Sequence, residues 1–229
     1  SLILIPASLP AEACAFLPNM ETAVNLIQDA APILGERVLV LGQGVIGLLA
    51  TSLLKEFPLE SLVTSDRYEL RRKASLEIGV HDSFDPDSIK DTFEESNSKH
   101  RIAYASIFDL TFELSGAPSV LNEAIAQTIF SGRVIIGSWY GEKKAPIDLG
   151  STFHRSRIKL ISSQVSSIAP ELSGRWDKAR RFDVAWKALE RIKPQKWITH
   201  RFPIEEAAKA YDLLDKNPQE TIQVLFEYQ

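Results

Sequence analysis

The sequence has little cysteine, no long apolar run and no large excess of charge, and each shortage excludes a class of protein. The single cysteine, Cys14, excludes an internal disulfide and any zinc site built from several cysteines. No apolar run approaches the roughly 18 residues that a membrane-spanning helix needs. A net charge of −4 provides no broad basic field for nucleic acid or an anionic membrane. With 229 residues, 45% of them hydrophobic, the chain has the composition of a soluble globular protein.

The amino terminus carries no recognisable targeting signal. The run from Ser1 to Pro6 is too short for the apolar core of a signal peptide, and no basic residues precede it. This run begins without methionine and has the composition of a strand entered in mid-protein, which suggests a fragment or a processed form. The cytoplasm is the expected compartment.

A glycine-rich turn is the most informative motif. The apolar run from Arg37 to Leu41 ends at three glycines with the spacing G-x-G-x-x-G, namely Gly42, Gly44 and Gly47. A helical pattern follows from Val45. In a dinucleotide site the first glycine allows the tight turn, the second lets the backbone approach the diphosphate, and the third lets helix and strand pack closely. The amides and positive dipole at the start of the helix would then bind the phosphates.

An acidic residue follows at the distance that such a site requires. Asp66 comes directly after the next apolar run, Ser61–Ser65, and 19 residues after Gly47. A carboxylate there accepts hydrogen bonds from the adenosine ribose hydroxyls. The alternative is a glycine turn of another α/β protein, with Asp66 as the N-cap of the following helix. Three coinciding features favour the dinucleotide site.

The same carboxylate favours NAD over NADP. Two unit charges about 4 Å apart repel by roughly 4 kcal/mol at an effective dielectric constant near 20, so Asp66 disfavours a 2′-phosphate. Arg67, Arg71 and Arg72 could offset part of this repulsion, but the sequence fits a solvated helix face for them better.

Strands and helices alternate along the chain with short links. Strands are expected near residues 38–41, 61–65, 83–84, 109–116, 133–138, 158–165 and 221–228. Helices are expected within residues 21–31, 45–57, 68–78, 86–98, 120–130, 177–192 and 204–214. This order predicts an α/β fold with a doubly wound parallel sheet and a ligand at the carboxyl ends of its strands. We predict a lead-in over residues 1–33, a dinucleotide-binding domain over 34–165 and a small α+β C-terminal lobe over 166–229.

Almost the whole chain after Ile5 resembles the medium-chain dehydrogenase/reductase superfamily, the zinc-type alcohol, sorbitol and threonine dehydrogenases. The motifs that bear the resemblance are Leu17–Ala23, Gly42–Gly47, Asp66 with Arg71, Phe112–Gly116, Gly132–Gly137 and Trp197–Ala207. The resemblance implies a Rossmann fold and an oxidoreductase that transfers hydride between a nicotinamide and an alcohol or carbonyl. It also implies a homodimer formed through the edge of the sheet near the sixth strand.

Departures from the family pattern limit what the resemblance implies. The family's N-terminal GroES-like domain and both of its zinc motifs are absent from this sequence. Leu17 and Pro18 stand where zinc-using relatives can place a ligand, and neither side chain binds zinc. No acid, base or metal ligand can be named, so the catalytic residues are unknown and zinc is unsupported. We therefore expect the cofactor-binding part of an enzyme, whose lobe over residues 166–229 would complete the missing catalytic domain.

The resemblance also implies individual contacts with the cofactor. It places Gly42, Gly44, Val45, Ile46 and Gly47 at the diphosphate, and Asp66 and Arg71 at the adenosine ribose. It places Leu114, Ser115 and Gly116, with Gly137 and Ser138 beside them, along the path to the nicotinamide ribose. The backbone from Ser163 to Val165 would fix the carboxamide. Thr22 would face the nicotinamide ring, or alternatively form only local bonds within its helix.

Other patterns leave alternatives open. A non-catalytic dinucleotide-binding subunit or sensor would have the same fold, whereas a methyltransferase usually has an acid where this chain has Leu41. The basic segment His154–Arg157 is expected near the cofactor end, as a carboxylate site or as a charged loop. The cluster of Arg175, Lys178, Arg180 and Arg181 reads as a solvated helix face. Trp139 and Tyr140 could stack on a ring, wall a pocket or form a dimer contact.

Overall fold

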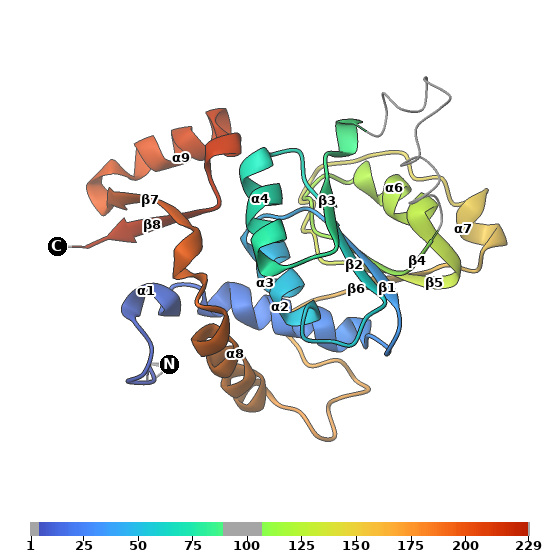
Figure 1. The fold of residues 1–229 in the computed structure, drawn as a ribbon, viewed down its shortest axis with the longest axis horizontal. Helices are drawn as coiled ribbons and strands as arrows, with labels where there is room; N and C mark the ends of the chain where they lie inside the picture. The colour runs from blue at the N-terminus through green and yellow to red at the C-terminus, as the bar shows by residue number, and fades with distance from the viewer. Residues whose placement is uncertain (1–4, 89–106, 229) are drawn as a thin grey trace.

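A computed structural model describes residues 5–88 and 107–228, which form an α/β fold around one parallel sheet (Figure 1). The helix expected within residues 86–98 and the strand expected at residues 1–6 lie mostly outside the described residues. Six strands lie in the order β3-β2-β1-β4-β5-β6, and every neighbouring pair is parallel. The strands are β1 (Arg37–Leu41), β2 (Ser61–Ser65), β3 (Asp82–Phe84), β4 (Phe108–Glu113), β5 (Thr128–Ile136) and β6 (Lys159–Ser162). This order confirms the predicted doubly wound sheet. The chain adds β2 and β3 on one side of β1 and β4, β5 and β6 on its other side, so the order of the strands reverses between β1 and β4.

Helices cover both faces of the sheet. One face packs on α2 (Leu17–Ala30), α3 (Val45–Leu54), α4 (Glu69–Ile78) and α8 (Lys178–Ile192). The other face packs on α6 (Val120–Gln127) and the short α7 (Thr152–Arg155).

The central strand β1 shows why the sheet needs two covers. Val38 and Val40 belong to the core under α2 and α3, and Leu39 and Leu41 to the core under α6. Successive side chains of a strand point to opposite faces, so a strand buried on both sides is apolar throughout. Each such side chain contributes roughly 1.5–3 kcal/mol when fully buried. The apolar run of β1 is therefore continuous because helices cover both faces of this strand.

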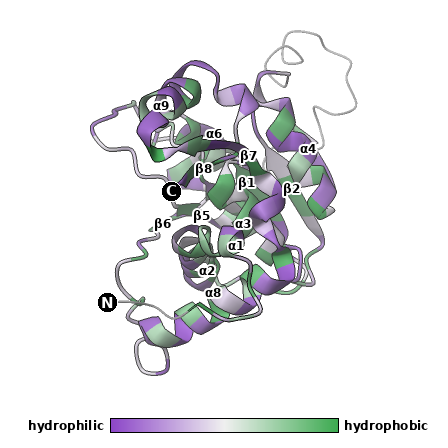
Figure 2. Cartoon of the chain, turned by 90° about the vertical axis from the view of Figure 1, so that its left-hand side faces the viewer, coloured by the Kyte–Doolittle hydropathy of each residue, from purple (hydrophilic) through white to green (hydrophobic). Residues whose placement is uncertain are grey.

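A second, two-stranded parallel sheet forms the C-terminal lobe, beside α4 in Figure 1. It pairs β7 (Ile198–Pro203) with β8 (Gln223–Glu227), and α9 (Ala207–Lys216) makes the crossover between them. Hydrophobic and hydrophilic residues alternate along α9 in Figure 2. Tyr211 and Leu214 on this helix are exposed. Sequence reasoning missed β7, because His200 and Arg201 interrupt its apolar pattern.

Several element boundaries differ from prediction. Helix α2 begins at Leu17, not Glu21, because Pro18 sits in the first turn, where proline is tolerated. Helix α6 ends at Gln127, and β5 begins at Thr128, five positions before the predicted start at Arg133. A short α1 (Ala11–Cys14) precedes α2. No helix in the described part of the chain is long and apolar enough to cross a bilayer.

Candidate functional site

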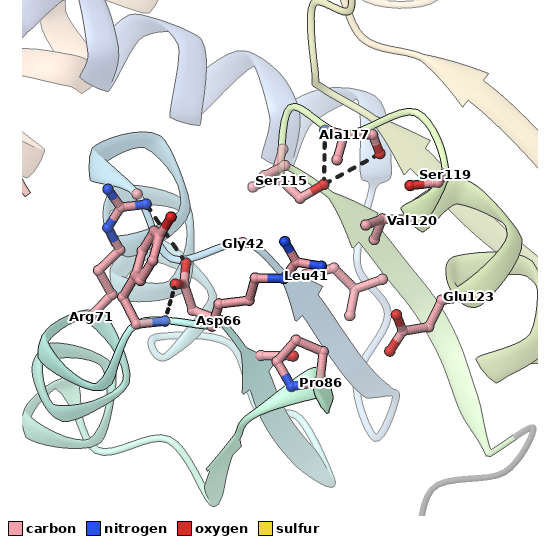
Figure 3. A pocket seen from close by; sticks show the side chains of 15 residues that line it. Leu41, Gly42, Asp66, Arg71, Pro86, Ser115, Ala117, Ser119, Val120 and Glu123 are labelled. Atoms are coloured by element: carbon pink, nitrogen blue, oxygen red, sulfur yellow. Dashed lines mark hydrogen bonds and ion pairs between the residues drawn. The ribbon is translucent and has the colours of Figure 1, made fainter. Parts of the chain in front are cut away.

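A cavity of about 310 Å³ opens at the carboxyl ends of β1, β2 and β4 (Figure 3). The cavity lies beside the point between β1 and β4 at which the strand order reverses. Doubly wound folds bind their ligands at the carboxyl ends of the strands at this point. The lining residues are Leu41, Gly42, Gly44, Ser65, Asp66, Arg67, Tyr68, Arg71, Pro86, Leu114, Ser115, Ala117, Ser119, Val120 and Glu123. Gly42, Gly44, Asp66, Arg71, Leu114 and Ser115 of the residues implied by the resemblance are thus brought together at one cavity.

The three glycines of the turn have three different surroundings. A Cβ on Gly42, whose φ is +97°, would lie 2.6 Å from the carbonyl oxygen of Leu114. A Cβ on Gly47 would lie 2.0 Å from the carbonyl oxygen of Gly42. A Cβ on Gly44 would meet nothing closer than the guanidinium of Arg71 at 4.0 Å. Two glycines are therefore required by packing within the chain, and Gly44 leaves open space beside the cavity.

The first turn of α3 supplies amide donors to this open space. The helix begins at Val45 with Gly44 as its N-cap, and no side chain of the described residues caps it. The amides of Val45, Ile46 and Gly47 stand at the positions that lack a carbonyl partner within a helix. Uncapped amides and the positive end of the helix dipole together form an anion site.

Asp66 forms the floor of the cavity on the β2 side. Its carboxylate accepts hydrogen bonds from the amides of Gln43 at 2.7 Å and Tyr68 at 2.9 Å, and only 8% of the residue is exposed. The N-cap of α4 is Tyr68, so the alternative that made Asp66 this cap is wrong. Asp66 instead holds the glycine turn against the end of β2.

Arg71 connects the cavity to the C-terminal lobe. Its Nη1 lies 4.0 Å from the carboxylate of Asp66, and its guanidinium lies over the ring of Tyr68. The Nε and Nη2 atoms donate to the carbonyls of Thr221 and Pro218 at 3.1 and 3.2 Å.

The prediction of a solvated helix face for the three arginines is wrong for Arg71 and Arg72, and Arg67, although solvated, precedes α4. The side chains of Arg71 and Arg72 are only 19% exposed, whereas the side chain of Arg67 is 66% exposed. Arg72 donates to the carbonyl of Asp66 and to the carboxylate of Asp85.

Glu113 organises the opposite wall. This carboxylate ends β4 and is fully buried. It accepts hydrogen bonds from the amide and hydroxyl of Ser115 and from the hydroxyl of Tyr140. Burial, together with the neighbouring carboxylate, raises the pKa of Tyr140. Sequence reasoning did not single out Glu113, although a carboxylate closing an otherwise apolar strand is a usable signal.

The segment after β5 completes this wall. Ser138 Oγ accepts a hydrogen bond from the amide of Gly116 at 2.9 Å. A Cβ on Gly137 would lie 2.5 Å from the side chain of Leu114, so the two strand ends are in close contact. Trp139 points outward and is 91% exposed.

Ser163 and Thr22 do not line the cavity. The hydroxyl of Ser163, just after β6, donates to Asp29 at 2.6 Å and accepts from Asn25 at 3.0 Å. Burial raises the pKa of Asp29, and its hydrogen bonds to Ser163 and Asn25 oppose this. Thr22 donates to the carbonyl of Pro18 one turn earlier, which is the local bonding given as its alternative.

Two predictions about basic segments are wrong in part. His154–Arg157 lies just before β6, whose first residue Lys159 pairs with Arg133 at the amino edge of the sheet. This is the edge opposite the cavity, because all strands run parallel. In the second cluster, Arg175, Lys178 and Arg180 are exposed as predicted, whereas Arg181 is fully buried. Among residues 5–88 and 107–228, no three His, Cys, Asp or Glu side chains are grouped to hold a metal ion.

Comparison with known proteins finds no matching family model but many related dehydrogenases. The chain is 23% identical to the starvation-sensing protein RspB of Escherichia coli K12, over 98% of this chain and 61% of RspB. It is 23% identical to the L-threonine 3-dehydrogenase of Xanthomonas euvesicatoria, over 94% of this chain and 58% of that protein. The chain thus spans about three fifths of the length of these relatives.

Solved structures show the same fold. A zinc-dependent alcohol dehydrogenase from Streptococcus pneumonia superposes with a TM-score of 0.80 at 22% identity, over all of this chain and 62% of that one. RspB of E. coli CFT073, solved in complex with NADH, gives a TM-score of 0.75 at 20% identity, over 97% of this chain and 61% of that one.

Proposed function

We propose that this chain, a relative of the zinc-type medium-chain dehydrogenases that spans about three fifths of their length, binds NAD. The enzyme to which it belongs would transfer hydride between the nicotinamide and an alcohol or carbonyl substrate. The observation that carries the proposal is the open space at Gly44, between the uncapped amides of α3 and the carboxylate of Asp66. The amides would bind the negatively charged diphosphate, and the carboxylate would accept hydrogen bonds from the uncharged ribose.

Each part of the cavity has a task in this proposal. The amides of the first turn of α3 would bind the diphosphate, since Gly44 presents no side chain to block its approach. Asp66 would accept hydrogen bonds from the adenosine ribose, while Arg71 balances its charge at 4.0 Å. Leu114, and Ser115 held by the carboxylate of Glu113, would line the path toward the second nucleotide.

The bound nicotinamide would supply the hydride chemistry, and this chain would supply binding and orientation. Support for NAD itself comes from the RspB structure solved with NADH. The buried Asp66 also disfavours a 2′-phosphate, by roughly 4 kcal/mol for charges about 4 Å apart at a dielectric constant near 20.

The test is a titration of the protein with NADH and with NADPH, followed by nicotinamide fluorescence. We expect tighter binding of NADH. Asp66→Asn should weaken NADH about 10- to 100-fold, because hydrogen bonds to a charged group contribute roughly 1.5–3 kcal/mol. The same substitution should narrow the preference for NADH over NADPH.

Asp109→Asn is the matched control. Asp109 also accepts a backbone hydrogen bond and pairs with an arginine, Arg37, but it lies at the opposite edge of the sheet. We expect NADH affinity in this variant to equal that of the wild type. Absence of NADH binding to the folded wild-type chain, or preferential binding of S-adenosylmethionine, would refute the proposal.

A further inference from the structure

A buried network centred on Arg181 holds the segment that follows β6. The residue is fully buried although it carries a charge. Its guanidinium donates to the carboxylate of Glu21 on α2 at 2.7 Å and to the amide oxygen of Asn25 at 2.7 Å. It also donates to the carbonyl oxygens of Val165 and Ser167. Arg181 therefore ties two helices to one stretch of backbone.

The network continues to the end of β6 itself. Asn25 uses its carbonyl oxygen for Arg181 and its amide nitrogen for Ser163 and Asp29. Ser163 in turn donates to Asp29 at 2.6 Å. The side chains of Arg181 and Asn25 thus bond to α2 and to the segment 163–167, through the Ser163 hydroxyl and the carbonyls of Val165 and Ser167.

Stability alone does not account for this network. Taking two charges out of water costs several kcal/mol per ion, and a buried ion pair often stabilises a fold no more than apolar residues of the same volume. Buried polar networks that are fully satisfied instead fix one geometry of the groups they join. Here the joined groups are the carbonyls of Val165 and Ser167, which the network holds in one position.

The held segment lies where the second half of a dinucleotide would bind. The adenosine half would lie at Asp66, at the end of β2. A doubly wound sheet binds its dinucleotide across the carboxyl edge, from one half of the strands to the other. On this sheet the second half consists of β4, β5 and β6, so the nicotinamide end would reach the backbone after β6.

We propose that Arg181 is a positioning residue for the nicotinamide end of the cofactor, acting through the backbone of residues 163–167 and not through contact with the ligand. This inference rests on the proposed binding of NAD. It predicts that loss of Arg181 affects ligands that contain nicotinamide and spares those that lack it.

The test compares NADH with ADP-ribose, which contains the adenosine and diphosphate but no nicotinamide. Both affinities are measured by calorimetry on wild type and on Arg181→Lys, which keeps the charge but cannot make the same set of bonds. We expect Arg181→Lys to bind NADH about tenfold more weakly and ADP-ribose with unchanged affinity. The blue shift of bound NADH fluorescence should decrease in parallel.

Arg180→Lys is the matched control, because Arg180 is the neighbouring residue on α8 but stacks on Trp176 at the surface. It should leave both affinities unchanged. If Arg181→Lys does not fold, Glu21→Gln replaces it, since this change keeps the acceptor oxygen and removes only the charge. A selective loss of about threefold for NADH is then expected.

The outcomes separate the two proposals. An equal loss of NADH and ADP-ribose in a folded variant, or no loss of either, overturns the positioning role and leaves NAD binding intact. Equal affinity of the wild type for the two ligands also overturns it. If the wild type binds neither NADH nor ADP-ribose, the proposed function is overturned, and the positioning role with it.

Discussion

Single residues decide the shape of the glycine turn. Because Gly47 has no side chain, α3 can lie close to the turn after β1. A methyl group at this position would overlap the carbonyl oxygen of Gly42. Asp66 then fixes the same turn from the side by accepting the amide of Gln43. The conformation of the turn is therefore fixed by contacts on the α3 side and on the β2 side before any ligand binds.

Gly47→Ala should destabilise the fold by about 1–3 kcal/mol, because the added Cβ would lie 2.0 Å from the Gly42 oxygen and the backbone has to move. NADH affinity should fall with it. Urea unfolding at a fixed pH measures the change. Gly174→Ala is the control, since a Cβ there meets nothing within 4 Å and its φ is not positive. The control should stay within about 0.5 kcal/mol of wild type, and equal stability of the two variants would contradict the packing argument.

At the scale of elements, α4 joins the cavity at the carboxyl ends of the strands to the C-terminal lobe. A two-stranded sheet is marginal by itself, and β7 and β8 pair only with each other among the described strands. Arg71 on α4 donates to the carbonyls of Pro218 and Thr221, just before β8. The lobe is thus attached to the cavity through the side chain expected at the adenosine ribose.

Arg71→Met should loosen the lobe while leaving the main sheet intact. Hydrogen bonds from a charged donor contribute roughly 1.5–3 kcal/mol, so amide exchange over residues 218–227 should accelerate about tenfold or more. Hydrogen–deuterium exchange with mass spectrometry measures it, with β1 and β2 as the internal reference. Arg72→Met is the control, because Arg72 bonds to Asp66, Arg67 and Asp85 and to nothing in the lobe. Unchanged exchange in Arg71→Met would show that other contacts hold the lobe.

At the scale of the whole molecule, β6 forms an outer edge of the sheet. An uncovered edge strand presents unpaired backbone groups that pair readily with another chain. The amide of Ser163 bonds inward to the carbonyl of Ile136. Because amides alternate in direction along a strand, the amide of Ser162 faces outward. A homodimer that continues the sheet across β6 would use this donor.

We predict a homodimer of about twice 25.6 kDa in sedimentation analysis. Ser162→Pro should shift it to the monomer, because proline removes the outward amide and leaves the inward bond of Ser163 in place. Ser162→Thr keeps the amide and should remain dimeric. A dimer that persists in Ser162→Pro, or a wild-type monomer at all concentrations, would contradict an interface through β6.

The sequence alone determined those features that depend on residues close together along the chain. The glycine spacing, the apolar run of β1 and the distance to Asp66 are local patterns, and they predicted the turn, the parallel sheet and three residues of the cavity, Gly42, Gly44 and Asp66. Arg71, Leu114 and Ser115 came from the family resemblance. Strand β2 and helix α4 were placed to within a residue, because apolar runs and the Gly79 stop are also local signals. The contacts implied for Thr22 and Ser163 lie outside this cavity and stay predictions.

Only the tertiary structure decided which charged residues are buried and which edge of the sheet a loop occupies. Arg181 looked solvated in sequence, and its partner Glu21 lies 160 positions away. Burial of a charge depends on such distant partners, so helical periodicity cannot reveal it. The segment His154–Arg157 was placed at the wrong edge, since a loop before a parallel strand and a loop after it look alike in sequence but lie at opposite ends of the sheet.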